Sequence, residues 1–325
     1  GRPVYFCSGE PQIRGTFMNS TMGVASTAGK FASCFALGAR ILKPFYPEFA
    51  ELIGSKADAA YQEGVKKPGN CQTASVLAPY IYEEDNWVDD MELGAIELYL
   101  FTGDRSYYDQ AIEYARREPV TPWMGADSAR HYQWYPFMNM GHYHIAKNGN
   151  ERVNKEFVRN LRTGIERTLE KAMESPYRHG IPYIWCSNNL TTAMLTQCRL
   201  YRELTGDDTY AEMEASLRDW LFGCNPWGTS MIVELPAHGD YPSQPHSSYL
   251  NAGKGNTTGG LVDGPVYFNI FKHLEGVNMD GIPNRPGDDY ARFQPDLMVY
   301  HDAIGDYSTN EPTMDGTACL TYYLS

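Results

Sequence analysis

The chain has 325 residues, 42% of them hydrophobic and 21% charged, a composition typical of a globular protein with a sizeable core. Its formal net charge of −13 argues against nucleic acid or an anionic membrane as a partner, because both require a basic surface. No apolar run approaches the roughly 18 residues that cross a bilayer. The cysteines are scattered and include no Cys-x-x-Cys pair, so they predict neither a zinc site nor a disulfide framework.

Apolar residues recur with helical periodicity along almost the whole chain, and no stretch shows sustained period-two alternation. This pattern predicts an all-α fold. In chain order we expect helices near residues 26–42, 47–63, 85–101, 106–117, 134–147, 152–174, 188–204, 209–222, 266–274 and 312–324.

Two joints between successive helices share the pattern Thr-Gly-Asp, at Thr102–Asp104 and at Thr205–Asp207. In each joint the glycine can close one helix in a left-handed conformation, and the aspartate can cap the next helix. The joints therefore look like corresponding hairpins in a ring of helix pairs. Long loops rich in Pro, Gly, Asn and Ser, at 223–264 and 277–300, are the expected place for a site. No linker divides the chain, so we expect a single domain over 1–325.

The chemically densest segment is Tyr300–Asp315, just before the last expected helix. Among its aromatic residues lie four carboxylates: Asp302, Asp306, Glu311 and Asp315. Crowded like charges and partial burial both raise a carboxyl pKa, as a general acid near neutral pH requires. Ser308-x-x-Glu311 also fits a helix capping box. Pro312 argues against that role, because a residue before proline is kept out of the α region and proline favours the first helical position. We expect the last helix to begin at Pro312, with the Glu311 carboxylate facing the mouth of a site.

This segment resembles the C-terminal signature of glycoside hydrolase family 9, in which the general-acid glutamate ends a D-x-x-x-D-Y-x-x-N-E pattern. The matching residues are Asp302, Asp306, Tyr307, Asn310 and Glu311. Other blocks are similar to family stretches in the same order. Trp87-Val-Asp89-Asp90 is similar to W-x-D-E, Trp185-Cys186-Ser187-Asn188 to W-G-S-N, the stretch from Gly223 to Ser230 to G-x-N-P-x-G-x-S, and Pro245-His246 to the start of P-H-H-R.

The resemblance implies an (α/α)6 barrel or toroid, incomplete at its N-terminus, that hydrolyses β-1,4-glucosidic bonds in cellulose or related β-glucans with inversion. Glu311 would be the general acid. The implied substrate-binding residues are His246, Tyr307, Asn310, Trp185 and Trp134, with Trp227 as a further stacking candidate. No cofactor is implied. A structural calcium stays unassigned, because no ligand spacing, including the Asp288-Asp289 pair, resembles a calcium loop. We expect a secreted, periplasmic or cell-surface protein.

Two departures from the family pattern matter. Ser247 and Ser248 follow His246, so the second histidine and the arginine of P-H-H-R are absent, and a serine cannot grip two sugar hydroxyls as a guanidinium can. The family's base lies in a D-A-G-D motif that is not found in this sequence. The chain also starts at Gly1 without an initiator methionine. We therefore expect the base before Gly1.

Alternative interpretations stay open on the sequence. The protein can be a sugar-binding relative that lost the base, or another helical-toroid enzyme such as a polysaccharide lyase or an unsaturated-glucuronyl hydrolase. The latter bind uronates and need a basic cleft, which the acidic balance disfavours. Single residues also have simpler roles: a loop histidine such as His246 can make a structural hydrogen bond, a tryptophan can be core, and Asp89 and Asp90 can complement a helix dipole.

Overall fold

The computed structural model describes residues 22–71, 86–120, 137–276, 278–279, 282–283, 287 and 290–325. These residues form two compact units. One unit holds the described residues before 121 together with those from 137 to Phe157, and the other runs from Val158 to Ser325. No helix within the described ranges is both long enough and apolar enough to span a membrane.

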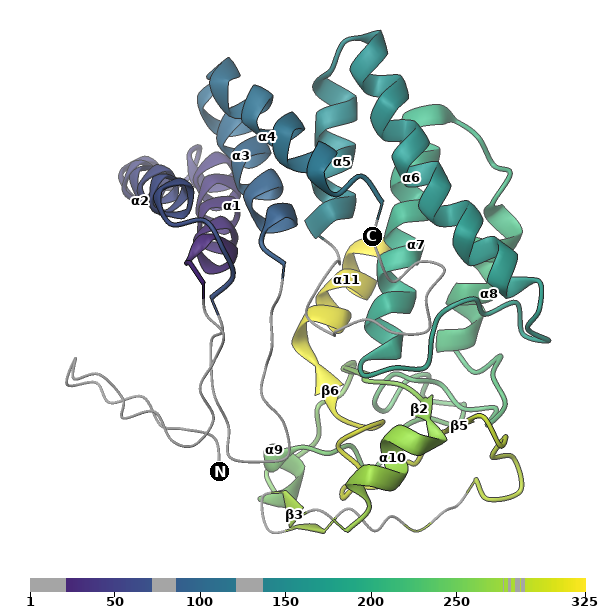
Figure 1. Ribbon diagram of the computed structural model, residues 1–325. Helices are drawn as coiled ribbons and strands as arrows, with labels where there is room; N and C mark the ends of the chain where they lie inside the picture. The colour runs from purple at the N-terminus through teal and green to yellow at the C-terminus, as the bar shows by residue number, and fades with distance from the viewer. Residues whose placement is uncertain are drawn as a thin grey trace. The chain divides into compact units, whose positions relative to one another are not determined.

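The first unit is built entirely of helices (Figure 1). They are α1 (Ala25–Leu42), α2 (Pro47–Lys66), α3 (Val88–Thr102), α4 (Arg105–Arg117) and α5 (Phe137–Asn148). Helix α1 packs against α2 and α3, and α3 packs against α4 and α5. The buried face of α1 is made of alanines spaced three or four residues apart, such as Ala32 and Ala36, and these small side chains let the helices approach closely.

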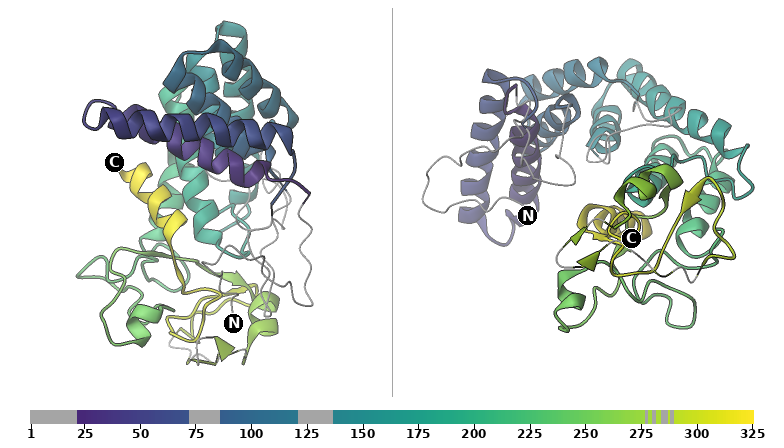
Figure 2. Two further views of the ribbon diagram at one scale, coloured as in Figure 1. Left: turned by 90° about the vertical axis from the view of Figure 1, so that its left-hand side faces the viewer. Right: turned by 60° about the horizontal axis from the view of Figure 1, so that its bottom comes forward.

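The second unit combines helices with short antiparallel ladders. Its helices are α6 (Glu151–Ala172, which starts in the first unit), α7 (Ser187–Thr205), α8 (Ala211–Leu221), α9 (Ser248–Asn251), α10 (Phe268–Leu274) and α11 (Met314–Leu324). Helix α7 is buried at nearly every position and packs against α8 and α11. Figure 2 shows α11, in yellow, alongside α7 in teal. Helix α7 is therefore the core helix of this unit.

The strands are two residues long and pair across large sequence distances. The pairs are β1 (Leu261–Val262) with β6 (Pro312–Thr313), β2 (Val266–Tyr267) with β5 (Met298–Val299), and β3 (Asn278–Met279) with β4 (Ile282–Pro283). Strands β1 and β2 both precede α10, so the first two ladders tie the segment before α10 to the segment between α10 and α11.

The all-α prediction is confirmed, and each expected helix matches an observed one to within about three residues at either end. Two of the predicted helices nevertheless begin in strands. Residues 266–267 form strand β2, and α10 starts at Phe268. Pro312 is not the first residue of the last helix but part of β6, and α11 starts at Met314. Pairing with β1 holds Pro312 extended, in a ladder position whose missing N–H is tolerated at an edge.

The two Thr-Gly-Asp joints are only partly alike. Gly103 and Gly206 both take the predicted left-handed conformation, with φ of 77° and 70°. Asp104 caps α4 as predicted, because its side chain accepts a 2.9 Å hydrogen bond from the Ser106 amide. The cap predicted for Asp207 is wrong: its carboxylate accepts from the Thr209 amide at 3.0 Å, and α8 starts later, at Ala211.

Candidate active site

The start of α7 anchors the strands that carry the acidic segment. The Ser187 hydroxyl donates to the Pro265 carbonyl at 2.7 Å, and the Asn188 side-chain amide donates to the Val262 carbonyl at 2.9 Å. The Asn189 side-chain oxygen accepts from the Thr313 hydroxyl at 2.8 Å. In the sequence these polar residues stood out only as part of a motif. Their role is to hold β1 and β6 against the core helix. The sequence signal for this role is the run of three short polar residues at the start of the helix, because such side chains readily bond to nearby backbone groups.

Two glycines permit this close packing. A Cβ at Gly264, whose φ is 89°, would lie 2.4 Å from Cγ of Asn188. A Cβ at Gly316 would lie 1.9 Å from Oδ1 of Asn189. Both positions therefore require glycine for steric reasons, and at Gly264 the backbone conformation requires it as well.

Glu311 is half-buried and lies immediately before β6. Continuing the register of the β1–β6 ladder places it directly opposite Asp263, whose amide donates to the Glu311 carbonyl at 2.9 Å. The backbone that carries this carboxylate is thus fixed by strand pairing and not, as predicted, by the first turn of a helix. A strand edge tied to a buried helix is a rigid mount for a reactive group.

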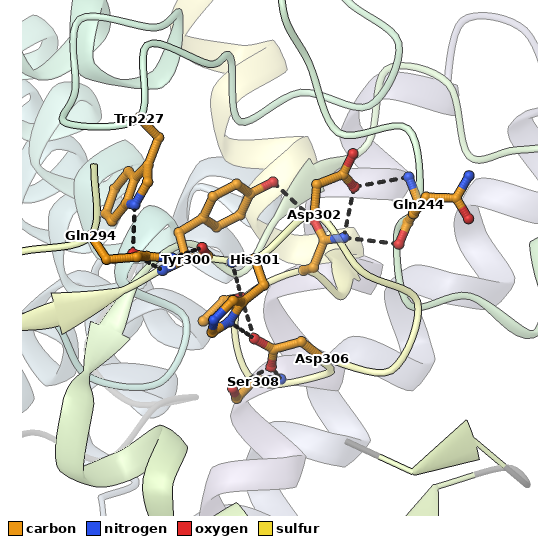
Figure 3. Close-up of polar contacts among 10 residues, drawn as sticks. Trp227, Gln244, Gln294, Tyr300, His301, Asp302, Asp306 and Ser308 are labelled. Atoms are coloured by element: carbon orange, nitrogen blue, oxygen red, sulfur yellow. Dashed lines mark hydrogen bonds and ion pairs between the residues drawn. The ribbon is translucent and has the colours of Figure 1, made fainter. Parts of the chain in front are cut away.

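Asp306 organises the turn before Glu311 (Figure 3). It is fully buried, and its carboxylate accepts hydrogen bonds from the Ser308 amide at 2.9 Å and hydroxyl, from the Thr309 hydroxyl at 2.8 Å and from Nδ1 of His301 at 2.7 Å. The turn is therefore wound around one carboxylate. Its removal would leave several buried donors without an acceptor.

Asp302 joins this turn to the loop that carries His246. Its carboxylate accepts from the amides of Ser243 and Gln244, both at 2.8 Å, and from the Asn310 side chain at 3.0 Å. Asn310 also donates to the Gln244 carbonyl at 2.9 Å and accepts from the Tyr300 hydroxyl at 3.0 Å (Figure 3). Asn310 is fully buried, with both amide atoms engaged. The expectation that it contacts substrate is not supported by this geometry, in which it is a structural link.

Three of the predicted site residues are brought together. The rings of Trp185 and Tyr307 lie with centroids 6.2 Å apart and planes 25° apart, and the His246 ring lies 5.7 Å from that of Tyr307. Trp185 and His246 are half-buried, whereas Tyr307 is only 1% exposed. The cluster lies beside the turn that leads to Glu311, because Tyr307 belongs to that turn.

Two polar groups of the cluster are the Tyr307 hydroxyl and the His246 imidazole. Within the part of the chain that the structure describes, the Tyr307 hydroxyl has no hydrogen-bond partner. Burial, followed by the charges of Asp306 and Glu311, raises the pKa of Tyr307 to about 12, so the hydroxyl stays protonated. Nδ1 of His246 lies 2.7 Å from the Ile304 carbonyl and must donate to it, which leaves Nε2 for another partner.

Other predicted residues do not join this cluster. Trp227 is only 4% exposed, packs against Trp220 and Tyr300, and donates its indole N–H to Gln294 at 2.7 Å. It therefore packs mainly within the core, and its role as a stacking platform stays a prediction. Trp134 and the Asp288-Asp289 pair lie outside the described residues. Over the described ranges, no group of three or more His, Cys, Asp or Glu side chains is placed to hold a metal ion.

A separate cavity of about 590 Å³ opens among the loops of this unit. Its lining is aromatic and acidic and includes Trp227, Asp240, Tyr241, Tyr290 and Asp302. Neither Glu311 nor the ring of Tyr307 lines it. The cavity therefore lies beside the network of Asp302.

Known proteins resemble this chain along nearly its whole length. The family model "Glycosyl hydrolase family 9" matches residues 7–324. Endoglucanase C of Cellulomonas fimi is 23% identical over 97% of the chain, and a cellulose 1,4-beta-cellobiosidase of Acetivibrio thermocellus is 24% identical over 67% of it. The chain spans 28% and 27% of the lengths of these two relatives.

Solved structures show the same similarity in three dimensions. A metagenome-derived family 9 endoglucanase superposes with a TM-score of 0.70 at 22% identity, covering 92% of this chain and 51% of its own. A family 9 protein of Bacteroides ovatus gives 0.65 at 18% identity over 92% of this chain and 52% of its own. These similarities support the predicted (α/α)6 fold class. With the family match over nearly every residue, they show that the chain belongs to glycosyl hydrolase family 9.

Proposed function

We propose that this chain provides the acid side of a site that hydrolyses β-1,4-glucosidic bonds with inversion, and that Glu311 is the general acid. The main support is the mount of Glu311, on a strand end tied to α7 and beside the cluster of Trp185, Tyr307 and His246. Membership of glycosyl hydrolase family 9 supports the interpretation of this arrangement as part of a hydrolytic site. It also argues against the lyase and glucuronyl hydrolase alternatives.

In the proposed reaction, protonated Glu311 donates its proton to the glycosidic oxygen as the bond to the leaving sugar breaks. A second carboxylate takes a proton from the water that attacks the opposite face of the sugar. The two carboxyl groups of an inverting pair stand roughly 6.5–9.5 Å apart to admit that water. We assign the base to none of the described residues.

The aromatic cluster suits one sugar unit next to the acid. The half-buried Trp185 offers an indole face on which the C–H face of a glucose ring can stack, and Tyr307 supports it from behind. Nε2 of His246 can accept a hydrogen bond from a sugar hydroxyl, because Nδ1 already carries the proton toward Ile304. Serine at 247 and 248 supplies no charged grip on this sugar, so binding there rests on stacking and neutral hydrogen bonds.

The names of the relatives suggest the substrate class. Those proteins are an endoglucanase and a cellulose 1,4-beta-cellobiosidase, and we extend to this chain a β-1,4-glucan substrate such as cellulose. A polymer of that size cannot enter a cell, so we also propose that the protein acts in a secreted, periplasmic or cell-surface setting.

The decisive variant is Glu311→Gln, made in an intact protein that carries both carboxyl groups and assayed on soluble cello-oligosaccharides by reducing-end release and, separately, by binding calorimetry. The amide keeps the shape but cannot donate as an acid, so cleavage should fall by about 10²–10⁴-fold while binding is kept. Glu212→Gln, on the exposed side of α8, is the matched control and should cleave normally. Retained cleavage by Glu311→Gln would refute the acid assignment. If an intact protein that carries both carboxyl groups binds cello-oligosaccharides without cleaving them, hydrolysis is refuted and the protein is a sugar-binding relative.

A further inference from the structure

The proposed reaction does not use the loop cavity, the cavity of about 590 Å³ among the loops of the second unit. This volume lies within the roughly 300–1,000 Å³ that is usual for small-molecule sites. Neither Glu311 nor any residue of the cluster of Trp185, Tyr307 and His246 lines it. Four aromatic and two acidic side chains contribute to its lining: Trp227, Tyr241, Tyr290 and Phe293, with Asp240 and Asp302. The loop cavity is therefore a candidate for a second binding site.

The most buried part of the lining is built from packed aromatic rings. The Tyr300 ring lies 5.6 Å from that of Trp227 and 5.8 Å from that of Tyr290, measured between centroids. Gln294 fixes this packing, because its side-chain oxygen accepts from the Trp227 indole at 2.7 Å and its side-chain amide donates to the Tyr300 carbonyl at 2.6 Å (Figure 3). These rings are held in place before a ligand arrives, which lowers the entropic cost of binding.

Two less buried rings complete the aromatic lining. Phe293 is 56% exposed, and Tyr241 is half-buried. The Phe293 amide donates to the Tyr290 carbonyl at 2.7 Å. The carbonyl of Asp240, the residue before Tyr241, accepts from the Ser230 amide at 2.9 Å. A partly exposed aromatic ring on anchored backbone suits stacking against the flat C–H face of a sugar.

The two acidic side chains of the cavity differ in the hydrogen bonds that they already make. The Asp302 carboxylate accepts four, all from its own network of protein groups. Within the described part of the chain, the Asp240 carboxylate accepts two long ones, from the Tyr241 amide at 3.2 Å and the Tyr290 hydroxyl at 3.4 Å. An ionised carboxylate has about four acceptor positions, so Asp240 has capacity left for the hydroxyl groups of a ligand.

The charge and size of the cavity limit what it can bind. No basic side chain is among the described residues that line it, so uronates and other anionic sugars are disfavoured. Over the same ranges, no three His, Cys, Asp or Glu side chains are grouped to hold a metal ion. Aromatic rings beside an acid also attract an ammonium group, but a cavity of about 590 Å³ is much larger than such a group needs. The lining therefore fits a neutral ligand rich in hydroxyl groups.

We propose that the loop cavity binds a segment of a neutral β-1,4-glucan, at a second site in addition to the one beside Glu311. Sugar rings stack on Phe293 and Tyr241, and a sugar hydroxyl donates to Asp240. The choice of a β-1,4-glucan rests on the proposed function, because the aromatic rings and the carboxylate by themselves specify only a neutral sugar. The site holds the polymer on the protein and takes no part in breaking the bond.

The test is a calorimetric titration of this chain with cellotriose, in a Trp185→Ala background that removes the stacking face beside Glu311. Binding should persist in Trp185→Ala, and adding Phe293→Ala should weaken it by about tenfold through the loss of one stacked ring. Leu297→Ala is the matched control, because Leu297 is 59% exposed in the same segment and does not line the cavity. No binding by Trp185→Ala, or binding that Phe293→Ala leaves unchanged, would overturn the proposal. Thermal unfolding midpoints show that the variants are folded.

A measurement on the unaltered chain keeps the proposal testable even if Trp185→Ala does not fold. Gly239 lines the cavity, so cellotriose should shift its ¹⁵N amide resonance in an NMR titration. Choline chloride is the probe for an ammonium ligand. A shift with choline and none with cellotriose would identify a cation site and overturn the proposal, and a shift with neither would overturn it as well.

The acid assignment and the second site can fail independently, because these titrations involve no turnover. If Glu311→Gln cleaves normally in an intact protein, the acid assignment fails, while cellotriose binding in the cavity still stands. If Glu311→Gln is inactive and the Gly239 resonance does not respond to cellotriose, only the second site fails.

Discussion

The two units stabilise their buried carboxylates in different ways. The first unit has four almost fully buried acids; Asp89 accepts from the Asn86 side-chain amide, and the other three are each bonded to a basic side chain. The pairs are Asp90 with Lys30 at 2.8 Å, Glu97 with Arg40 at 3.1 Å, and Glu92 with His142 at 2.6 Å. Each pair holds neighbouring helices together and cancels most of its own charge, so these acids suit a structural role.

In the second unit, the buried Asp263 and Asp306 and the half-buried Asp302 are held mainly by neutral donors, whereas the buried Glu214 of α8 is bonded to Arg202. Asp302 receives backbone amides, a hydroxyl and an amide side chain, and Asp263 receives a thiol. Asp306 receives an amide and two hydroxyls, with His301 as its one basic partner. Neutral donors orient a carboxylate without cancelling its charge, so the negative field around Glu311 persists. The difference separates acids that hold helices from acids that tune a site.

The largest expected effect is that of Asp306→Ala. The change leaves the hydroxyls of Ser308 and Thr309 and Nδ1 of His301 without their acceptor in a buried turn. We expect a loss of about 3 kcal/mol in the free energy of unfolding, measured by urea titration, and a loss of about 100-fold or more in cleavage because the turn carries Glu311. Asp240→Ala, at an exposed loop position, should cost less than about 0.5 kcal/mol. Equal losses in the two variants would contradict the central role of Asp306.

Lys30→Met should show the opposite profile, with lost stability and little direct effect on the chemistry. It removes the Lys30 ammonium from Asp90, which is 2% exposed, while Lys30 itself is partly exposed. Because solvent screens part of the pair, we expect a loss of about 2 kcal/mol, below the range for a fully buried pair. The double variant with Asp90→Asn should recover part of this loss in a double-mutant cycle. No recovery would mean that the charge of Asp90 is balanced elsewhere.

The pair of Glu92 and His142 should make stability depend on pH. Burial raises the pKa of Glu92 to about 7, and although burial lowers the pKa of His142, the Glu92 carboxylate raises it on balance. The folded pair thus binds more protons than the unfolded chain between about pH 4.5 and 7, so its contribution is greatest at acidic pH and declines as pH rises. Relative to Glu92→Gln, the wild-type free energy of unfolding should fall by up to about 1.4 kcal/mol per pH unit there.

The comparison with Glu92→Gln also removes an opposing contribution. Burial, followed by the charges of Arg40 and Lys147, lowers the pKa of His144 to about 4, so this residue makes stability rise between about pH 4 and 6.5. His144 is present in both proteins and cancels in the difference. A difference that does not vary with pH would show that Glu92 is ionised throughout.

The helices were predictable because their signals are local. Apolar spacing, Gly103 and the Asp104 cap all act within a few residues of the helix ends that they define. Strand β6 was not predictable, because two residues carry no periodicity and their conformation depends on β1, which lies some fifty residues earlier. The same cause misplaced the start of α11 at Pro312.

The site was predictable only where a motif named a residue. Glu311 was found from its pattern and from Pro312, although its mount is a strand and not a helix. Nothing in Leu-Val-Asp-Gly-Pro distinguishes Asp263, which the ladder sets opposite Glu311. Asn310 is the opposite case. The family motif indicates a substrate-binding residue, but its side chain is fully buried and bonds to Tyr300 and Asp302 within the protein.

The smallest expected effect is shared by the two units. Gly103 and Gly206 both have φ near 70–80° and have no atom within 4 Å of an added Cβ, so alanine there meets only backbone strain. Gly103→Ala and Gly206→Ala should each cost about 1 kcal/mol in the free energy of unfolding, and asparagine should cost less because it tolerates the left-handed region. Asp104 caps α4 at the first joint, whereas no side chain caps α8 at the second. If the two alanine variants lose unequal amounts of unfolding free energy, the cap and not the glycine determines the stability of the joint.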